Sequence, residues 1–218
     1  MSHIGAASET ELAGKEKEPT ESRTAVMLGQ IQLHFLINTL SAIRVLCRKN
    51  PEKAEQATAA LAEFLRGNMD SLTADKPVPF ERELAHTQNY LNIELLRFPK
   101  RLHIRYDLGA TSFCMPTLTL QPLVENAVRH GIAKRAEGGT ITIATRETDS
   151  AYIVTVSDDG VGYSAQTNDD GRTHIGIQNV RMRLAAMCGG TLDITGAPSA
   201  GTEASIRIPK GEDECLSI

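Results

Sequence analysis

The segment that decides the fold spans residues 121–131 and reads QPLVENAVRHG. Read as a helix, it has one apolar side, and its polar side carries Pro122, Glu125, Asn126, Arg129 and His130. Residues three and four positions apart share a helix face, so Asn126 can point at one ligand together with Arg129 or His130. An amide oxygen suits Mg²⁺, and a guanidinium group suits phosphate. The segment alone therefore predicts either a phosphate- and metal-binding helix or an ordinary amphipathic surface helix.

Three later stretches favour the first of these two interpretations. DDGVG (158–162) follows a strand-like run, and IGIQNVRMRL (175–184) opens a helix after a loop rich in Gly and Asp. Gly201 and Thr202 precede the last strand-like run. DDG by itself predicts only a β-turn. In this order and spacing, the four stretches resemble the N, G1 and G2 boxes and the final Gly-Thr element of the GHKL nucleotide-binding superfamily of gyrase, Hsp90, histidine kinases and MutL.

An upstream motif narrows the resemblance to one family. HFLINTL (34–40), joined to QPLVENA (121–127), is similar to the LytS/YehU-type sensor histidine kinases over about residues 27–210. This resemblance implies an α+β chain, in which a helical dimerisation bundle precedes a two-layer α/β sandwich, the GHKL or Bergerat ATP-binding fold. It further implies ATP and Mg²⁺ as ligands and a response regulator as partner.

The composition agrees with such a protein. The 218 residues suffice for one or two domains, and a net charge of −4 argues against a protein that binds nucleic acid through its phosphates. There is neither a run of about 18 apolar residues nor a signal peptide, so we expect a cytoplasmic protein without a membrane segment, or the cytoplasmic part of a membrane-bound parent. The four cysteines lack metal-ligand spacing.

Four regions are expected along the chain. They are a disordered linker (1–23), a helical dimerisation and histidine phosphotransfer region (24–100), an ATP-binding catalytic domain (101–211) and a frayed tail (212–218). In the second region, the residue pattern predicts three helices: one over 25–48, one from Pro51 onwards and one over 80–98. A loop is expected over 73–79. Glu81, Glu83 and Arg97 are expected on a solvated helix face.

The first helix carries an apolar seam at alternating spacings of four and three, formed by Gly29, Leu33, Leu36, Leu40, Ile43 and Cys47. One hairpin cannot bury both sides of this seam, so we expect a homodimer joined by a four-helix bundle.

His34 and Asn38 lie off the seam, one helical turn apart on the same face. An isolated His of this kind is either solvated or functional, and the resemblance implies that His34 is the phospho-acceptor. Asn38 either holds water for dephosphorylation of the partner regulator or is an ordinary helix-face residue. Leu33 departs from the family, which has Pro before its His, and Phe35 stands where many histidine kinases have an acidic residue.

The catalytic domain is expected to place helices on one face of a mixed sheet. The predicted helices span 116–130 and 175–188, and the predicted strands span 102–108, 138–146, 151–157, 191–195 and 202–208.

The resemblance implies a role for each polar residue of the boxes. Asp158 reads the adenine amino group with support from Thr202, while Gly160 and Gly162 allow positive φ and a close backbone approach. Asn126 binds Mg²⁺ and Arg129 binds phosphate, and His130 either joins them or is solvated. Gly176 offers phosphate a helix N-terminus, and Asn179 is a lid or phosphate contact. His174 replaces a family Gly and either stiffens the loop or touches phosphate. Asp159 is expected to be solvated, and Arg181 and Arg183 to serve surface or packing roles.

The chemistry is expected to be phosphoryl transfer to a side chain. ATPases of the superfamily place a water-activating Glu one turn before the metal-binding Asn, and here that position is Pro122. Glu125 is an acid–base group, a residue that tunes Mg²⁺ binding, or a capping or solvated carboxylate. We therefore expect a two-component sensor histidine kinase core that phosphorylates His34 and passes the phosphoryl group to an Asp of a response regulator. The alternatives are an anti-sigma-type serine/threonine kinase, or a nucleotide-binding dimeric scaffold without phosphotransfer.

Overall fold

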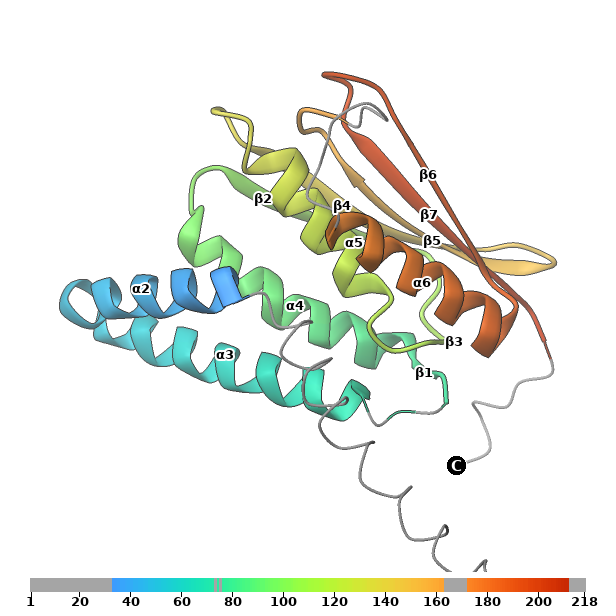
Figure 1. Cartoon of the computed structure of the whole chain (residues 1–218), viewed down its shortest axis with the longest axis horizontal. Helices are drawn as coiled ribbons and strands as arrows, with labels where there is room; N and C mark the ends of the chain where they lie inside the picture. The colour runs from blue at the N-terminus through green and yellow to red at the C-terminus, as the bar shows by residue number, and fades with distance from the viewer. Residues whose placement is uncertain (1–32, 73, 75, 163–171, 212–218) are drawn as a thin grey trace, which may run out of the picture. The chain divides into compact units, whose positions relative to one another are not determined.

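The computed structural model describes residues 33–72, 74, 76–162 and 172–211, and for residues 33, 34, 72 and 172–175 only the course of the backbone (Figure 1). The expected linker, the first turns of the first helix and the expected tail lie outside the described residues. The chain forms two compact units that meet between Asn38 and Thr39. The first unit is therefore described only where helix α2 begins, and the second contains the rest of the fold.

Helices α2 (Leu33–Lys49) and α3 (Pro51–Leu72) are separated by Asn50. The Asn50 side-chain oxygen accepts a hydrogen bond from the backbone N–H of Lys53 at 3.0 Å, which satisfies one of the N–H groups left open at a helix start. Pro51 takes the first helical position, where its missing N–H costs nothing. The predicted start of the second helix is confirmed.

Helix α3 packs against helix α4 (Phe80–Arg97) through an apolar stripe that includes Ala57, Leu61 and Phe64. The Phe64 ring stacks on His86 of α4 with 5.5 Å between ring centroids. On α2, Thr39 is buried, whereas Leu40 is 52% exposed. The seam position Leu40 is thus open on the isolated chain, and the predicted homodimer stays a prediction.

A five-stranded mixed sheet forms the second layer (Figure 1). Its strands, in spatial order, are β2 (Leu102–Leu108), β4 (Gly139–Glu147), β5 (Ala151–Asp158), β7 (Thr202–Pro209) and β6 (Thr191–Gly196). β2 pairs with β4 in parallel, and the other pairs are antiparallel. Buried and less buried residues alternate along β4 and β7, as expected for strands with one face towards a core.

Helices cover one face of this sheet: α5 (Leu120–Asn126), the π-helix η1 (Ala127–Ile132) and α6 (Arg172–Cys188) (Figure 1). α5 and η1 contact β5, and α6 contacts β6 and β7. The core between the layers contains Leu120, Val124, Ile132, Ile141, Ile143, Leu184 and Ile206. This is the expected α+β chain with a two-layer α/β sandwich, and the five strands agree with the predicted ranges to within one residue.

Two features differ from the sequence prediction. The helix expected from residue 116 begins at Leu120, because the preceding residues form a turn in which Leu118 has a φ of 51°. Two short strands, β1 (Val78–Pro79) and β3 (Cys114–Met115), pair with each other, and the first lies at the end of the expected 73–79 loop. No helix in the described part of the chain is both long enough and apolar enough to cross a bilayer.

Candidate nucleotide site

Asp158 ends strand β5 and lies opposite Thr202, the first residue of β7. Its carboxylate accepts a hydrogen bond from the Gly160 N–H at 2.9 Å and is further hydrogen-bonded by the side chain and backbone of Thr202. Burial raises the pKa of Asp158, and these hydrogen bonds oppose that rise. The carboxylate is therefore fixed in direction and only 9% of the residue is exposed, as an acceptor that reads one ligand group requires.

Two glycines bring the segment 121–131 against this carboxylate. A Cβ atom on Gly131 would stand 2.3 Å from Oδ1 of Asp158, and a Cβ atom on Gly160 would stand 2.4 Å from the backbone of Gly131. Only glycine fits at either position, because real Cβ atoms do not approach so closely. Glycine is thus required at residue 160 because of its close contact with Gly131, and not because of a positive φ. Gly162 has the expected positive φ, at 80°.

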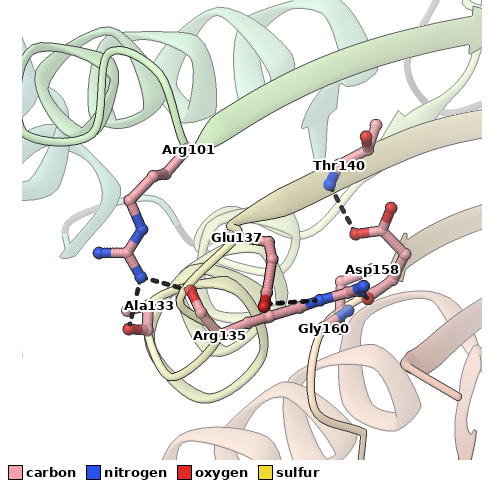
Figure 2. Close-up of polar contacts among 8 residues, drawn as sticks. Arg101, Ala133, Arg135, Glu137, Thr140, Asp158 and Gly160 are labelled. Carbon is pink, nitrogen blue, oxygen red and sulfur yellow. Dashed lines mark hydrogen bonds and ion pairs between the residues drawn. The ribbon is translucent and has the colours of Figure 1, made fainter. Parts of the chain in front are cut away.

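Asp159 is exposed, as the sequence suggested, and it is also tied into the fold by hydrogen bonds. Its Oδ1 atom accepts the backbone N–H of Thr140 at 2.6 Å, which fixes the start of β4. Arg135 donates from Nη1 to the backbone carbonyl of Asp159, and its Nε atom lies 3.6 Å from Glu137 (Figure 2). These contacts hold the DDG turn from the side opposite Thr202.

Arg101 continues this network towards the helical region (Figure 2). It lies between α4 and β2, and its Nη2 atom donates to the carbonyl oxygens of Ala133, at 3.2 Å, and of Arg135. Its guanidinium group also lies over the Phe98 ring, 5.6 Å from the centroid. The backbone just after the π-helix, at Ala133 and Arg135, is therefore held by Arg101, and the Arg135 side chain is held by the carbonyl of Asp159.

The π-helix changes the geometry expected for Asn126, Arg129 and His130. The Ala133 N–H donates to Val128 O at 2.8 Å, a bond across five residues that widens the turn. The simple α-helical spacing predicted for these side chains is therefore wrong across residues 127–132. Single π-turns inside helices occur frequently at functional sites.

Glu125 has an environment that the sequence left open. It is half-buried, and burial raises its pKa to about 7, against the opposing charge of Arg129 and with a further rise from Glu94 of α4. Glu94 is itself buried and bound by Arg97, whose Nη1 atom lies 2.6 Å from Oε1 and 2.9 Å from Oε2. A carboxyl group with a pKa near neutrality can both accept and release a proton, which favours the acid–base alternative.

Sequence reasoning placed Glu83 wrongly, and it gave Arg183 a surface or packing role without identifying what it binds. Glu83 was expected on a solvated face but is only 2% exposed, and its carboxylate accepts three backbone N–H bonds at the start of α5. Arg183 of α6 donates to two backbone carbonyls just before that start. A signal was present: Glu83 lies at the apolar-stripe spacing of α4 with Phe80, Thr87 and Tyr90, all buried.

Helix α6 begins at Arg172, three residues before the predicted start. Gly176 therefore lies in the second turn of α6 and not at its N-terminus, as the sequence suggested. It is half-buried, and no described residue outside its own helix lies within 4 Å of the place where its Cβ would stand. Asn179 is half-buried one turn on. The side chain of His174 lies outside the described part of the structure.

His34 is described only by its backbone in α2, and Asn38 is half-buried on the same helix. Among the described residues, no group of three or more His, Cys, Asp or Glu side chains could hold a metal ion. The fixed acceptor Asp158 suits an adenine amino group, and the amide of Asn126 suits Mg²⁺ bound to phosphates, so these two residues fit ATP.

Two family models match the chain. The model described as "Histidine kinase" matches residues 22–102, and the model described as "Histidine kinase-, DNA gyrase B-, and HSP90-like ATPase" matches residues 116–212. Together they span the helical region and the sandwich.

Relatives and a solved structure agree with these models. The uncharacterised protein YwpD of Bacillus subtilis is 34% identical over 202 residues, which are 89% of this chain and 73% of that protein. The sensor protein LytS of Oceanobacillus iheyensis is 30% identical over 204 residues, 85% of this chain but 35% of LytS, so the chain spans about a third of it. The Acinetobacter baumannii histidine kinase AdeS has the same fold, with a TM-score of 0.50, 18% identity and coverage of 88% of this chain and 98% of that one.

Proposed function

Because this chain belongs to the LytS-type histidine kinases, we propose that it is a catalytic core that binds Mg-ATP, phosphorylates His34 and passes the phosphoryl group to an Asp of a response regulator. Residues 24–100 serve dimerisation and phosphotransfer, and residues 101–211 bind the nucleotide. The core works as a homodimer in the cytoplasm, either by itself or as part of a longer membrane-bound protein.

One observation supports this proposal most directly: the contact of Gly131 with the Asp158 carboxylate, which joins two sequence boxes into one site. Asp158 accepts the adenine amino group, and the hydroxyl of Thr202 keeps the carboxylate turned towards it. An acceptor that is buried and hydrogen-bonded in this way distinguishes adenine from bases without that amino group, because an unmatched buried carboxylate is costly.

The phosphate half of the site is assigned to residues of η1 and α6. Asn126 would bind Mg²⁺, which neutralises the charge of the phosphates. Arg129 and His130 would face the phosphates as cations or donors, and Gly176, His174 and Asn179 would bind or cover them from the start of α6. In-line transfer depends mainly on such positioning and on charge neutralisation.

The proton chemistry is assigned to Glu125. To attack, the imidazole of His34 must carry no proton on the attacking nitrogen. As the phosphorus–nitrogen bond forms and ADP leaves, the proton on the other ring nitrogen is released or shared with a base. A carboxyl group whose pKa is about 7 serves as a base in its ionised form near neutral pH. Asn38, one turn from His34, would hold water for dephosphorylation of the regulator.

Incubation of the chain with ATP labelled at the terminal phosphate tests the proposal. We expect a phosphoprotein that is labile in acid and stable in base, and that is lost in His34→Ala. An acid-stable label would support a serine/threonine kinase instead, and binding of ATP without any label would support a scaffold. A label that remains in His34→Ala would refute the assignment of the phospho-acceptor.

A further inference from the structure

Three backbone N–H groups at the start of α5 converge on one buried carboxylate. Glu83 Oε2 accepts from Leu118 N at 3.1 Å, and Glu83 Oε1 accepts from Thr119 N at 2.8 Å and Leu120 N at 3.0 Å. The N–H groups of a first helical turn have no partner within the helix, so this carboxylate satisfies groups that would otherwise be buried unpaired. Glu83 belongs to α4, and it therefore joins the helical region to the segment that carries Asn126.

Arg183 binds the same turn through its carbonyl groups. Its Nη1 atom donates to Thr117 O and to Leu118 O, at 2.7 Å each. Arg183 lies on α6, the helix that begins at Arg172 and carries Gly176. One short turn is thus bound through its N–H groups from α4 and through its carbonyl groups from α6.

The turn between these two side chains has an unfavourable backbone conformation. Leu118 has a φ of 51°, in the left-handed region that is unfavourable for a residue with a Cβ atom. Such conformations persist only where the surroundings impose them, and they gather at functional sites. Glu83 and Arg183 are the surroundings that impose this one, since both bind the peptide groups of Leu118.

Stability alone does not require this pair. Burial raises the pKa of Glu83, while its three hydrogen bonds and the charge of Arg183 oppose that rise, and burial likewise lowers the pKa of Arg183. Buried ion pairs can often be replaced by apolar side chains with little loss of stability or even a gain. What apolar side chains cannot do is fix the direction of individual peptide groups.

We propose that Glu83 and Arg183 are positioning residues that set the first turn of α5, and thereby the metal- and phosphate-binding half of the nucleotide site. This rests on the proposed function. Asn126 is the last residue of α5, whose first turn the pair binds. Gly176 lies on α6, the helix that carries Arg183. The adenine half, Asp158 and Thr202, lies on two other elements, β5 and β7.

The proposal predicts a selective defect. We call the Glu83–Arg183 pair the clamp. Loss of the clamp should reduce the part of the ATP affinity that depends on Mg²⁺ and should not change the part that depends on adenine. In Glu83→Gln, the side chain keeps its size, but its NH₂ group faces a backbone N–H donor, so at least one hydrogen bond of the turn is lost. Loss of one hydrogen bond to a charged group corresponds to roughly a tenfold change in an equilibrium constant.

The experiment is calorimetry of ATP binding with Mg²⁺ and with EDTA, on the whole chain. We expect the ratio of the two affinities to fall about tenfold in Glu83→Gln relative to the wild type, with the EDTA affinity unchanged within about twofold. Glu81→Gln is the matched control, because Glu81 is exposed on the same helix. Arg183→Lys, with exposed Arg181→Lys as its control, should lower the ratio less, since a lysine keeps the charge but lacks the fork of donors. It also replaces Glu83→Gln if that variant fails to fold.

The outcomes separate the two proposals. ATP binding by the wild type, with an unchanged Mg²⁺ ratio in Glu83→Gln and Arg183→Lys, overturns the clamp and leaves the proposed function intact. An equal loss of affinity with Mg²⁺ and with EDTA also overturns it, because a general structural role predicts that result. If the wild type binds no ATP under either condition, the proposed function fails and the clamp fails with it.

Discussion

Oδ1 of Asp158 lies 2.3 Å from the point where a Cβ atom on Gly131 would stand. This relationship joins the end of the π-helix to the end of strand β5, through two residues that are 27 positions apart in the chain. An added methyl group at residue 131 would have to displace the carboxylate, and with it the hydrogen bonds from Gly160 and Thr202.

Gly131→Ala is therefore expected to lower ATP affinity more than tenfold and to destabilise the fold by about 1–3 kcal/mol, the usual cost of overpacking. Calorimetry and thermal denaturation measure the two effects. Gly211→Ala is the control, because nothing lies within 4 Å of its Cβ position. Normal ATP affinity in a folded Gly131→Ala protein would contradict the site.

Asp158→Ala removes the proposed adenine acceptor directly. Loss of a hydrogen bond to a charged group costs roughly 1.5–3 kcal/mol, so ATP affinity should fall about ten- to a hundredfold. Asp193→Ala on β6 is the control, since Asp193 is exposed. If Asp158→Ala binds ATP like the Asp193 variant, adenine is read elsewhere.

The raised pKa of Glu125 leads to a prediction of how the stability of the fold depends on pH. Its pKa is about 7 in the folded chain and 4.5 in a model peptide, so between these values the folded state binds a proton that the unfolded state has released. Stability contributed by this group therefore falls as the pH rises from about 4.5 to 7, and stays low above 7. Burial is the main cause of the raised pKa of Glu125; the charge of Arg129 on η1 opposes it, and that of Glu94 on α4 adds to it.

Glu125→Gln should remove that loss. We expect the variant to be more stable than the wild type at pH 8, by about 1–3 kcal/mol or several degrees in Tm, and equal to it at pH 5. Thermal denaturation at both values measures this, with Glu81→Gln as the exposed control. The same shift at pH 5 and pH 8 would mean that Glu125 is not held protonated.

The exposure of Leu40 leads to a prediction of the oligomeric state. It is 52% exposed on α2 and belongs to the apolar seam, so we expect another copy of the chain to cover it. Leu40→Glu would place a charge in that contact and should convert a dimer into a monomer at tens of micromolar protein. Sedimentation measures the change, and a wild-type chain that is already monomeric would contradict the expected bundle.

Asn38 lies four residues after His34, one turn along α2. Its amide can donate and accept, and so can hold a water molecule beside an acyl phosphate docked at His34. Asn38→Ala should keep autophosphorylation near the wild-type rate but slow the loss of phosphate from the regulator in the presence of ADP. Equal decay with both proteins would leave Asn38 a structural residue.

The sequence by itself determined the order of the elements and the identity of the boxes. Periodicity and turn residues are local properties, which is why the five strands, the cap at Asn50 and the stripe of α3 follow from the sequence. The resemblance to the kinase family rests equally on local motifs, and it supplied the pairing of Asp158 with Thr202.

Only the tertiary structure decided which polar groups are buried and what they bind. Glu83 and Leu118 are 35 residues apart, and no spacing rule connects a carboxylate to backbone N–H groups at that distance in the chain. The contact of Gly131 with Asp158, the pKa of Glu125 beside Glu94 and the carbonyl groups held by Arg183 likewise arise where separate elements pack together. The free energy of a charged group depends on its burial and its partners, and both are set by packing between elements rather than by the residues on either side.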